Sequence, residues 1–184
     1  MFGRLFRRAS ESDTIAASLY GAIVAQARKP ALYSDFGVAD TVDGRFEMVV
    51  LHAVLVIERL EAGGEREALV AQKVFDLYNT DMDRSLRELG VGDLGVPKRM
   101  KKMAERFYGR AAAYGPLLAE GDHGGLADAF ERNVFGAKAD GAQPLADYAL
   151  ASHRSLRAMP KGVLLSVALA FVDPAGFAPV EVSA

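Results

Sequence analysis

Between Phe75 and Arg110 the charge of the side chains changes sign: acidic residues come first and cationic residues follow. Carboxylates can bind a metal ion or act as an acid–base pair, and clustered cations can bind phosphate, anionic lipid or an acidic protein. The spacing of the residues decides among these kinds of site. Four acidic residues precede a glycine-rich turn and six cationic residues follow it: Asp76, Asp81, Asp83 and Glu88, then Lys98, Arg99, Lys101, Lys102, Arg106 and Arg110.

The acidic half begins like a calcium-binding loop but does not continue as one. Asn79, Asp81 and Asp83 stand at alternate positions, as the first ligands of such a loop do. Arg84 then occupies the position that needs glycine, and Gly90 the position that needs glutamate. On a helix, Asp81 and Asp83 also point in different directions, so they do not form an acid–base pair. The segment therefore predicts neither a metal site nor a catalytic site.

The rest of the chain has no other catalytic group in a recognisable arrangement. It has no cysteine, which excludes disulfides, thiol catalysis and cysteine-bound zinc. The histidines, His52, His123 and His153, lack the spacing of a helical zinc site. We therefore expect a protein that is not an enzyme and that has no metal or other cofactor. We expect His52 to be a core histidine; haem binding by His52 or His153 is the weaker alternative.

Apolar residues at helical spacing dominate the sequence and predict an all-α, single-domain bundle of about seven helices. Ser12 or Asp13 is the expected cap of the first helix, which ends at Pro30. Residues 44–62 are apolar almost all round, which predicts a buried central helix. Further helices are expected over residues 65–90, 95–120 (interrupted at Gly115–Pro116), 125–136, 144–159 and 161–172.

Two short tails are expected to flank the helical domain of residues 12–172. They are a basic tail, residues 1–11, and a C-terminal tail, residues 173–184. The basic tail is followed by polar residues, unlike a secretory signal, and no segment has the roughly 20 apolar residues of a spanning helix. We expect a cytoplasmic protein, peripheral at the inner face of the cytoplasmic membrane. The candidate membrane contacts, which compete with a frayed end, are Phe2, Arg4, Leu5, Phe6, Arg7 and Arg8.

The helix that follows Pro97 has two unlike faces. One is an apolar stripe of Met100, Met103, Phe107, Ala111 and Tyr114, and most of the cations lie opposite it. The basic stripe suits phosphate, anionic lipid or an acidic protein; the alternative is a solvated face with an ordinary Lys101–Glu105 pair. Because the net charge is only −2, any such affinity must be local, and we expect no DNA binding. An RNA- or ribosome-binding module based on Lys98–Arg110 is the alternative function.

Three segments resemble the ubiquinol–cytochrome c chaperone family, in its compact bacterial form. They are FEMVVLHAVLVIERL (residues 46–60), AQKVFDLYNTDMDRSLRELGVGDLGVPKRMKKMAERFYGRAAAY (residues 71–114) and FERNVFG (residues 130–136). The chain lacks the long N-terminal extension of the mitochondrial members. The resemblance implies an all-helical, non-enzymatic assembly factor for respiratory complex III that binds newly made cytochrome b. Mitochondrial members work near the ribosomal exit with a small partner protein.

By this resemblance we assign the partner-binding surface to residues 75–110, the segment in which the charge changes sign. Its acidic residues would receive the basic loops of cytochrome b. Its basic residues would lie on an anionic membrane surface or on the ribosome. The candidate residues are Asp81, Asp83, Arg87, Asp93, Lys98, Arg99, Lys102, Arg106, Tyr108 and Arg110.

Overall fold

The computed structural model describes residues 2–160, 164–165, 169 and 171–177, with residues 2–10 described only in their backbone. This part of the chain contains seven α-helices and no strand, which confirms the all-α prediction. Most of the helix predicted over residues 161–172, and residues 178–184 of the C-terminal tail, lie outside the described residues. The helices are α1 (Phe2–Ala27), α2 (Ala31–Ser34), α3 (Val42–Glu61), α4 (Glu65–Glu88), α5 (Val96–Glu120), α6 (His123–Phe130) and α7 (Ala142–Ala158), with a π-helix η1 (Glu131–Phe135) and a 3₁₀ helix η2 (Pro174–Phe177).

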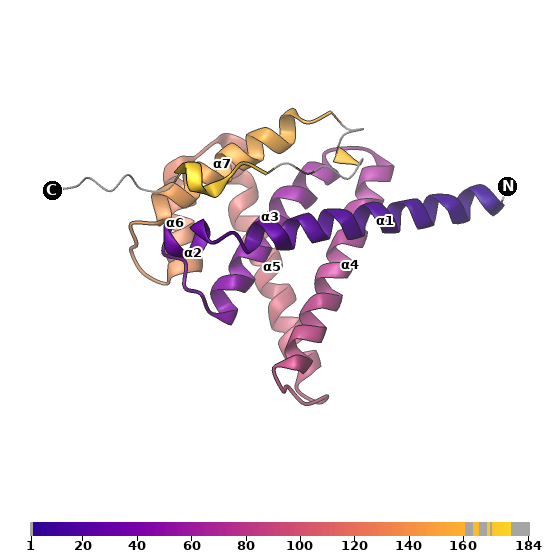
Figure 1. The fold of residues 1–184 in the computed structure, drawn as a ribbon, viewed down its shortest axis with the longest axis horizontal. Coiled ribbons are helices and arrows are strands. Elements are labelled where there is room, and N and C mark those ends of the chain that lie inside the picture. Colours follow the sequence, from indigo (N-terminus) through magenta and orange to yellow (C-terminus); the bar gives the residue numbers. More distant parts are fainter. Residues whose placement is uncertain (1, 161–163, 166–168, 170, 178–184) are drawn as a thin grey trace.

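Helix α3 is the buried central helix that the sequence predicts. The Thr41 hydroxyl accepts a hydrogen bond from the Gly44 amide and caps its start. Fourteen of its 20 residues are buried, because α1, α4, α5 and α7 pack around it (Figure 1). Such a helix is hydrophobic on every side. None of the described helices combines the length and the apolar character needed to cross a membrane.

Helix α1 begins ten residues earlier than expected. The predicted cap at Ser12 or Asp13 is wrong, because the helix runs through both residues from Phe2 to Ala27. Ser12 is buried, and the Asp13 carboxylate forms an ion pair with Lys73 of α4 rather than capping α1. A residue type that favours a helix end is thus used here for contact between two helices.

The interruption predicted at Gly115–Pro116 is also wrong. Helix α5 continues through Pro116 to Glu120 and ends at Gly121, whose φ of +72° is left-handed. Proline removes the hydrogen bond to the carbonyl of Ala112, four residues earlier. Both Pro116 and Ala112 are exposed, so water can satisfy that carbonyl.

Helices α4 and α5 form a hairpin whose far end projects from the rest of the molecule (Figure 1). Aromatic rings join the two helices: the Phe107 ring lies 4.9 Å from Phe75 and 5.0 Å from Tyr78 between centroids. At the tip, residues 89–95 form the turn, and Gly90 has a φ of +80°, which favours glycine. The hairpin presents the segment that changes sign at one end of the molecule.

Replacing a helical glycine by alanine is expected to have opposite effects on stability at two sites, Gly109 and Gly44. A Cβ added at Gly109, inside α5, would meet nothing within 4 Å. We therefore expect Gly109→Ala to raise the free energy of unfolding by about 0.5–1 kcal/mol. A Cβ added at Gly44 in α3 would lie 1.9 Å from the Ala39 carbonyl oxygen, so Gly44→Ala should lower it by about 1–3 kcal/mol. Urea unfolding of both variants measures this; equal effects would contradict the packing described.

Candidate functional site

The tip of the hairpin is held together by one arginine. The Arg87 guanidinium donates to the carboxylate of Asp83, one helical turn earlier, at 2.7 Å and also to Asp93 in the turn. These two hydrogen bonds raise the pKa of Arg87 above its ordinary value. Asp83 and Asp93 thus belong to one exposed network that joins the end of α4 to the turn.

Asp81 has a different environment from Asp83. The Tyr20 hydroxyl of α1 donates to its carboxylate at 2.8 Å, and Arg84 forms an ion pair with it. Burial and the neighbouring carboxylate both raise the pKa of Tyr20, so the hydroxyl keeps its proton and remains the donor. The Asp81 side chain is only 18% exposed and joins α4 to α1. The two aspartates therefore serve different contacts, as the helical spacing predicts.

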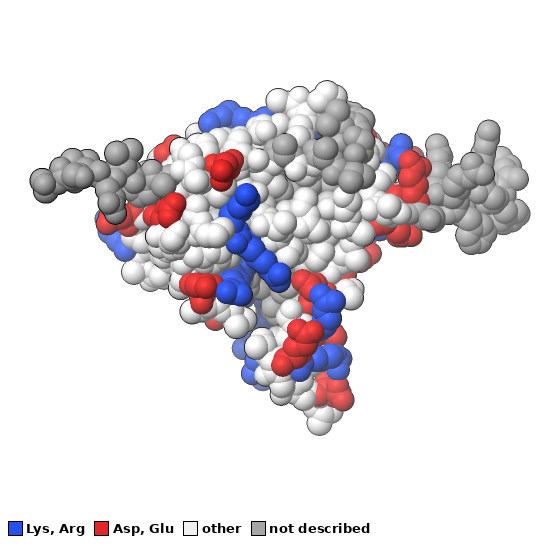
Figure 2. Space-filling view, viewed as in Figure 1, with Lys and Arg blue, Asp and Glu red and all other residues white. Residues whose placement is uncertain are grey.

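The cationic residues of α5 fall into two groups. Lys98, Arg99 and Lys102 are exposed near the tip, and they have no ion pair within the described part of the chain. Lys101 lies 3.9 Å from Glu105, the ordinary four-apart pair considered above. The space-filling view shows charges of both signs close together on the projecting end (Figure 2). The free cations of the first group are the part of the predicted basic stripe that a partner can reach.

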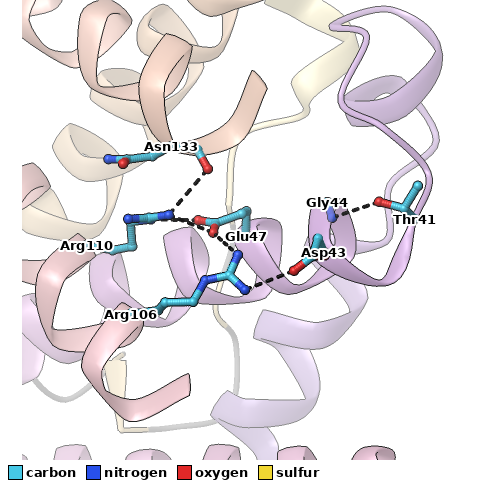
Figure 3. Close-up of polar contacts among 7 residues, drawn as sticks. All are labelled: Thr41, Asp43, Gly44, Glu47, Arg106, Arg110 and Asn133. Atoms are coloured by element: carbon cyan, nitrogen blue, oxygen red, sulfur yellow. Dashed lines mark hydrogen bonds and ion pairs between the residues drawn. The ribbon is translucent and has the colours of Figure 1, made fainter. Parts of the chain in front are cut away.

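Arg106 and Arg110, the second group, turn toward α3 and meet Glu47, whose side chain is 3% exposed (Figure 3). Arg106 donates to Glu47 Oε1 at 2.7 Å and to Asp43 Oδ1 at 2.9 Å. Arg110 forms two bonds of 2.9 Å, from Nε to Oε2 and from Nη2 to Oε1 of Glu47. We call these four residues the Glu47 cluster; its two carboxylates balance its two guanidinium groups.

Neighbouring groups complete the Glu47 cluster. The Arg106 guanidinium lies 4.5 Å from the centre of the Phe46 ring, and Arg110 also reaches the Asn133 carbonyl in η1 at 3.4 Å. Burial opposes the charge of Arg106, but the hydrogen bonds to its two carboxylate partners outweigh burial and raise its pKa. The hydrogen bond to Glu47 likewise raises the pKa of Arg110. The cluster thus fastens the base of α5 to α3.

The ten predicted partner-binding residues therefore do not share one environment. Arg106 and Arg110 follow Lys102 at four-residue steps along α5 but are paired with Glu47, and their contact with a partner stays a prediction. Tyr108 is exposed beside the Phe75 ring, whose centroid lies 5.4 Å away. The tip also exposes apolar residues that charge patterns did not single out: Leu94 is 99% exposed. The sequence did contain one indication of this exposed residue, because Leu94 is an apolar residue inside a glycine-rich turn.

His52 is a core histidine, as predicted. Its Nδ1 lies 2.7 Å from the Met48 carbonyl, which can only accept, so Nδ1 carries the proton. Its Nε2 then accepts from the Tyr148 hydroxyl at 2.6 Å. Complete burial lowers the pKa of His52 to about 4. Both ring nitrogens are occupied, so the weaker alternative of haem ligation by His52 has no support in this geometry.

Comparisons with known proteins agree on one family. A model of the ubiquinol-cytochrome C chaperone family matches residues 34–171. The chain is also similar to a solved structure, the crystal structure of the Cbp3 homolog from Brucella abortus. The sequence identity is 39% and the TM-score 0.86, with 95% of this chain and 98% of that chain covered. No curated protein matches the chain.

Proposed function

Because the chain belongs to the ubiquinol–cytochrome c chaperone family, and so is a chaperone rather than an enzyme, we propose that it binds newly made cytochrome b and assists the assembly of respiratory complex III. The observation that supports this most directly is the match over residues 34–171, which includes the whole projecting hairpin. A chaperone needs an accessible surface for its client, and the hairpin offers charged and apolar groups at its tip.

The proposed binding mode divides the tip by charge. Cytoplasmic loops of multi-span membrane proteins carry excess lysine and arginine. The carboxylates of Asp83 and Asp93 would give up some of their hydrogen bonds to Arg87 and bind the cationic side chains of such a loop instead. On the other side of the turn, Lys98, Arg99 and Lys102 are free to lie on anionic lipid. The proposed membrane contacts of residues 2–8 concern side chains outside the described part of the chain.

Deletion of the gene tests the function. We expect loss of cytochrome b, measured by immunodetection and by the absorption of membrane b-type haem, while other respiratory complexes remain. Unchanged cytochrome b would reject the proposed client. The RNA-binding alternative would then be tested by the salt dependence of binding to ribosomal RNA, which should be steep if phosphate contacts dominate.

The exposed cations predict a loss of membrane affinity. Each lysine or arginine near an anionic surface contributes about 1 kcal/mol. The triple variant Lys98→Gln, Arg99→Gln, Lys102→Gln should therefore bind phosphatidylglycerol-containing vesicles about 100-fold less tightly in a flotation assay. Lys101→Gln, whose cation is already paired with Glu105, is the matched control and should change binding little. Equal flotation of the triple variant and the unchanged chain would refute membrane contact by this face.

A further inference from the structure

A groove of about 300 Å³ lies beside Asp81, where α1, α3 and α4 meet. This volume is at the lower end of ligand-binding sites, which span about 300–1,000 Å³. Its lining comes from five helices and is mostly apolar, including Val24, Val42, Val49, Met82, Leu86 and Met103. The two methionines are flexible and adapt to apolar side chains of different shape. The groove therefore suits apolar side chains rather than a charged small molecule.

Charged residues line the two walls of the groove with opposite dominant signs. Arg28 and Arg45 belong to the wall of α1 and α3, and Asp81 and Glu88 belong to the wall of α4.

Some of these charges are already used inside the protein. Arg45 pairs with Asp40 at 2.6 Å, and Asp81 with Tyr20 and Arg84. Arg28 has no ion pair among the described residues, and Glu88 has a long one, 4.0 Å from Arg84. Among the described residues, the lining of the groove thus includes one cation without an ion pair and one anion with only a long one.

We propose that this groove holds an apolar helical segment of the client polypeptide, with a cationic residue beside Glu88 and an anionic residue beside Arg28. A fatty acyl chain carries one head group and cannot complement both walls, whereas a helix presents apolar anchors three and four residues apart with charges on either side. The proposal rests on the proposed function, because the spanning segments of cytochrome b before assembly supply such helices. It adds that the chaperone covers apolar surface as well as charged loops.

A labelled synthetic peptide of about 18 residues tests the groove directly, since this length forms several helical turns. The probe has a leucine face, a lysine on one flank and an aspartate on the other. We expect Val42→Asp and Val24→Asp to weaken its binding about tenfold or more in fluorescence anisotropy. Val42 is 60% exposed in the first turn of α3, where an acidic residue favours the helix, so the fold should persist.

Controls separate the groove from other apolar surface. Leu69→Asp, which changes an exposed leucine of α4 outside both the groove and the tip, should leave peptide binding unchanged. The double variant Arg28→Glu, Glu88→Lys should prefer a peptide with its two charges exchanged. Equal binding by all variants, stronger binding of oleate than of the peptide, or dimer formation through Val42 in sedimentation would overturn the proposal.

Complementation distinguishes failure of the groove from failure of the function. In a deletion strain that has lost cytochrome b, the Val42→Asp chain should restore much less of it than the Leu69→Asp chain, whose substitution lies outside both the groove and the tip. Full restoration by Val42→Asp would reject the groove and leave the assembly role intact. If deletion leaves cytochrome b unchanged, the assembly role fails, and with it the client named for the groove, whatever the peptide shows.

Discussion

Replacing Glu47 by glutamine is expected to lower the free energy of unfolding by about 3 kcal/mol, which corresponds to a fall of about 10 °C in Tm for a chain of this size. The substitution keeps the size of the side chain and removes its charge. Arg106 and Arg110 would then retain only Asp43 as a carboxylate partner, and the cluster would carry a net positive charge. Breaking a buried pair typically costs about 3–5 kcal/mol; we expect the lower end because both arginines are partly exposed.

The matched control for this prediction is Glu105→Gln on α5. Glu105 also forms an ion pair, but that pair with Lys101 is exposed and 3.9 Å long, so its loss should cost no more than about 0.5 kcal/mol. Urea unfolding at neutral pH measures both variants. A loss below about 1 kcal/mol for Glu47→Gln would mean that the cluster does not fasten α5 to α3.

Stability is expected to fall by about 2 kcal/mol between pH 6.5 and pH 5 because of His52. The pKa of His52 is lowered to about 4 in the folded protein, against about 6.5 in the unfolded chain. Below pH 6.5, His52 therefore binds a proton in the unfolded chain but stays neutral in the folded protein. A difference of one bound proton changes the free energy of unfolding by about 1.4 kcal/mol per pH unit. The stability that comes from keeping His52 neutral is therefore present above pH 6.5 and is lost as the pH falls toward 4. The total loss is about 3 kcal/mol.

The pH dependence can be assigned with two variants. His52→Gln should reduce the slope of unfolding free energy against pH in this range by about one proton, whatever its effect on stability at pH 7. His153 also has a lowered pKa, chiefly through burial and against the attraction of Glu58, so His153→Gln measures its separate share. An unchanged slope in His52→Gln would show that the Met48–His52–Tyr148 chain of hydrogen bonds does not exclude the proton.

The fold was largely predictable from local patterns. Helix α3 was recognised by its length and apolar character, and the hairpin by its glycine-rich turn and by Pro97 at the start of α5. The errors occur where tertiary contacts override a local preference. Asp13 binds Lys73 instead of capping a helix, and Pro116 remains inside α5 because its side of the helix is exposed.

The candidate site was predictable only where its contacts are local. Asp83 and Arg87 are one helical turn apart, so their ion pair follows from spacing. Glu47 and Arg110 are 63 residues apart, and the sequence around each of them does not predict the contact. A glutamate directly before the long apolar run of α3 was the hint in the sequence that this helix receives cations. The apolar groove beside Asp81 is lined by residues of five helices, so no local sequence pattern indicates it.

The projecting hairpin and the Glu47 cluster differ in how far the effect of a substitution extends. Within the described part of the chain, the hydrogen bonds and ion pairs of residues 87–99 all join residues of the hairpin itself. Substitutions there change what the protein presents to a partner while leaving the contacts of α3 untouched. The Glu47 cluster, in contrast, joins four residues of α3 and α5, so a substitution at any one of them disturbs the contact between the two helices. What the tip presents can thus be altered one residue at a time, on a scaffold that stays the same.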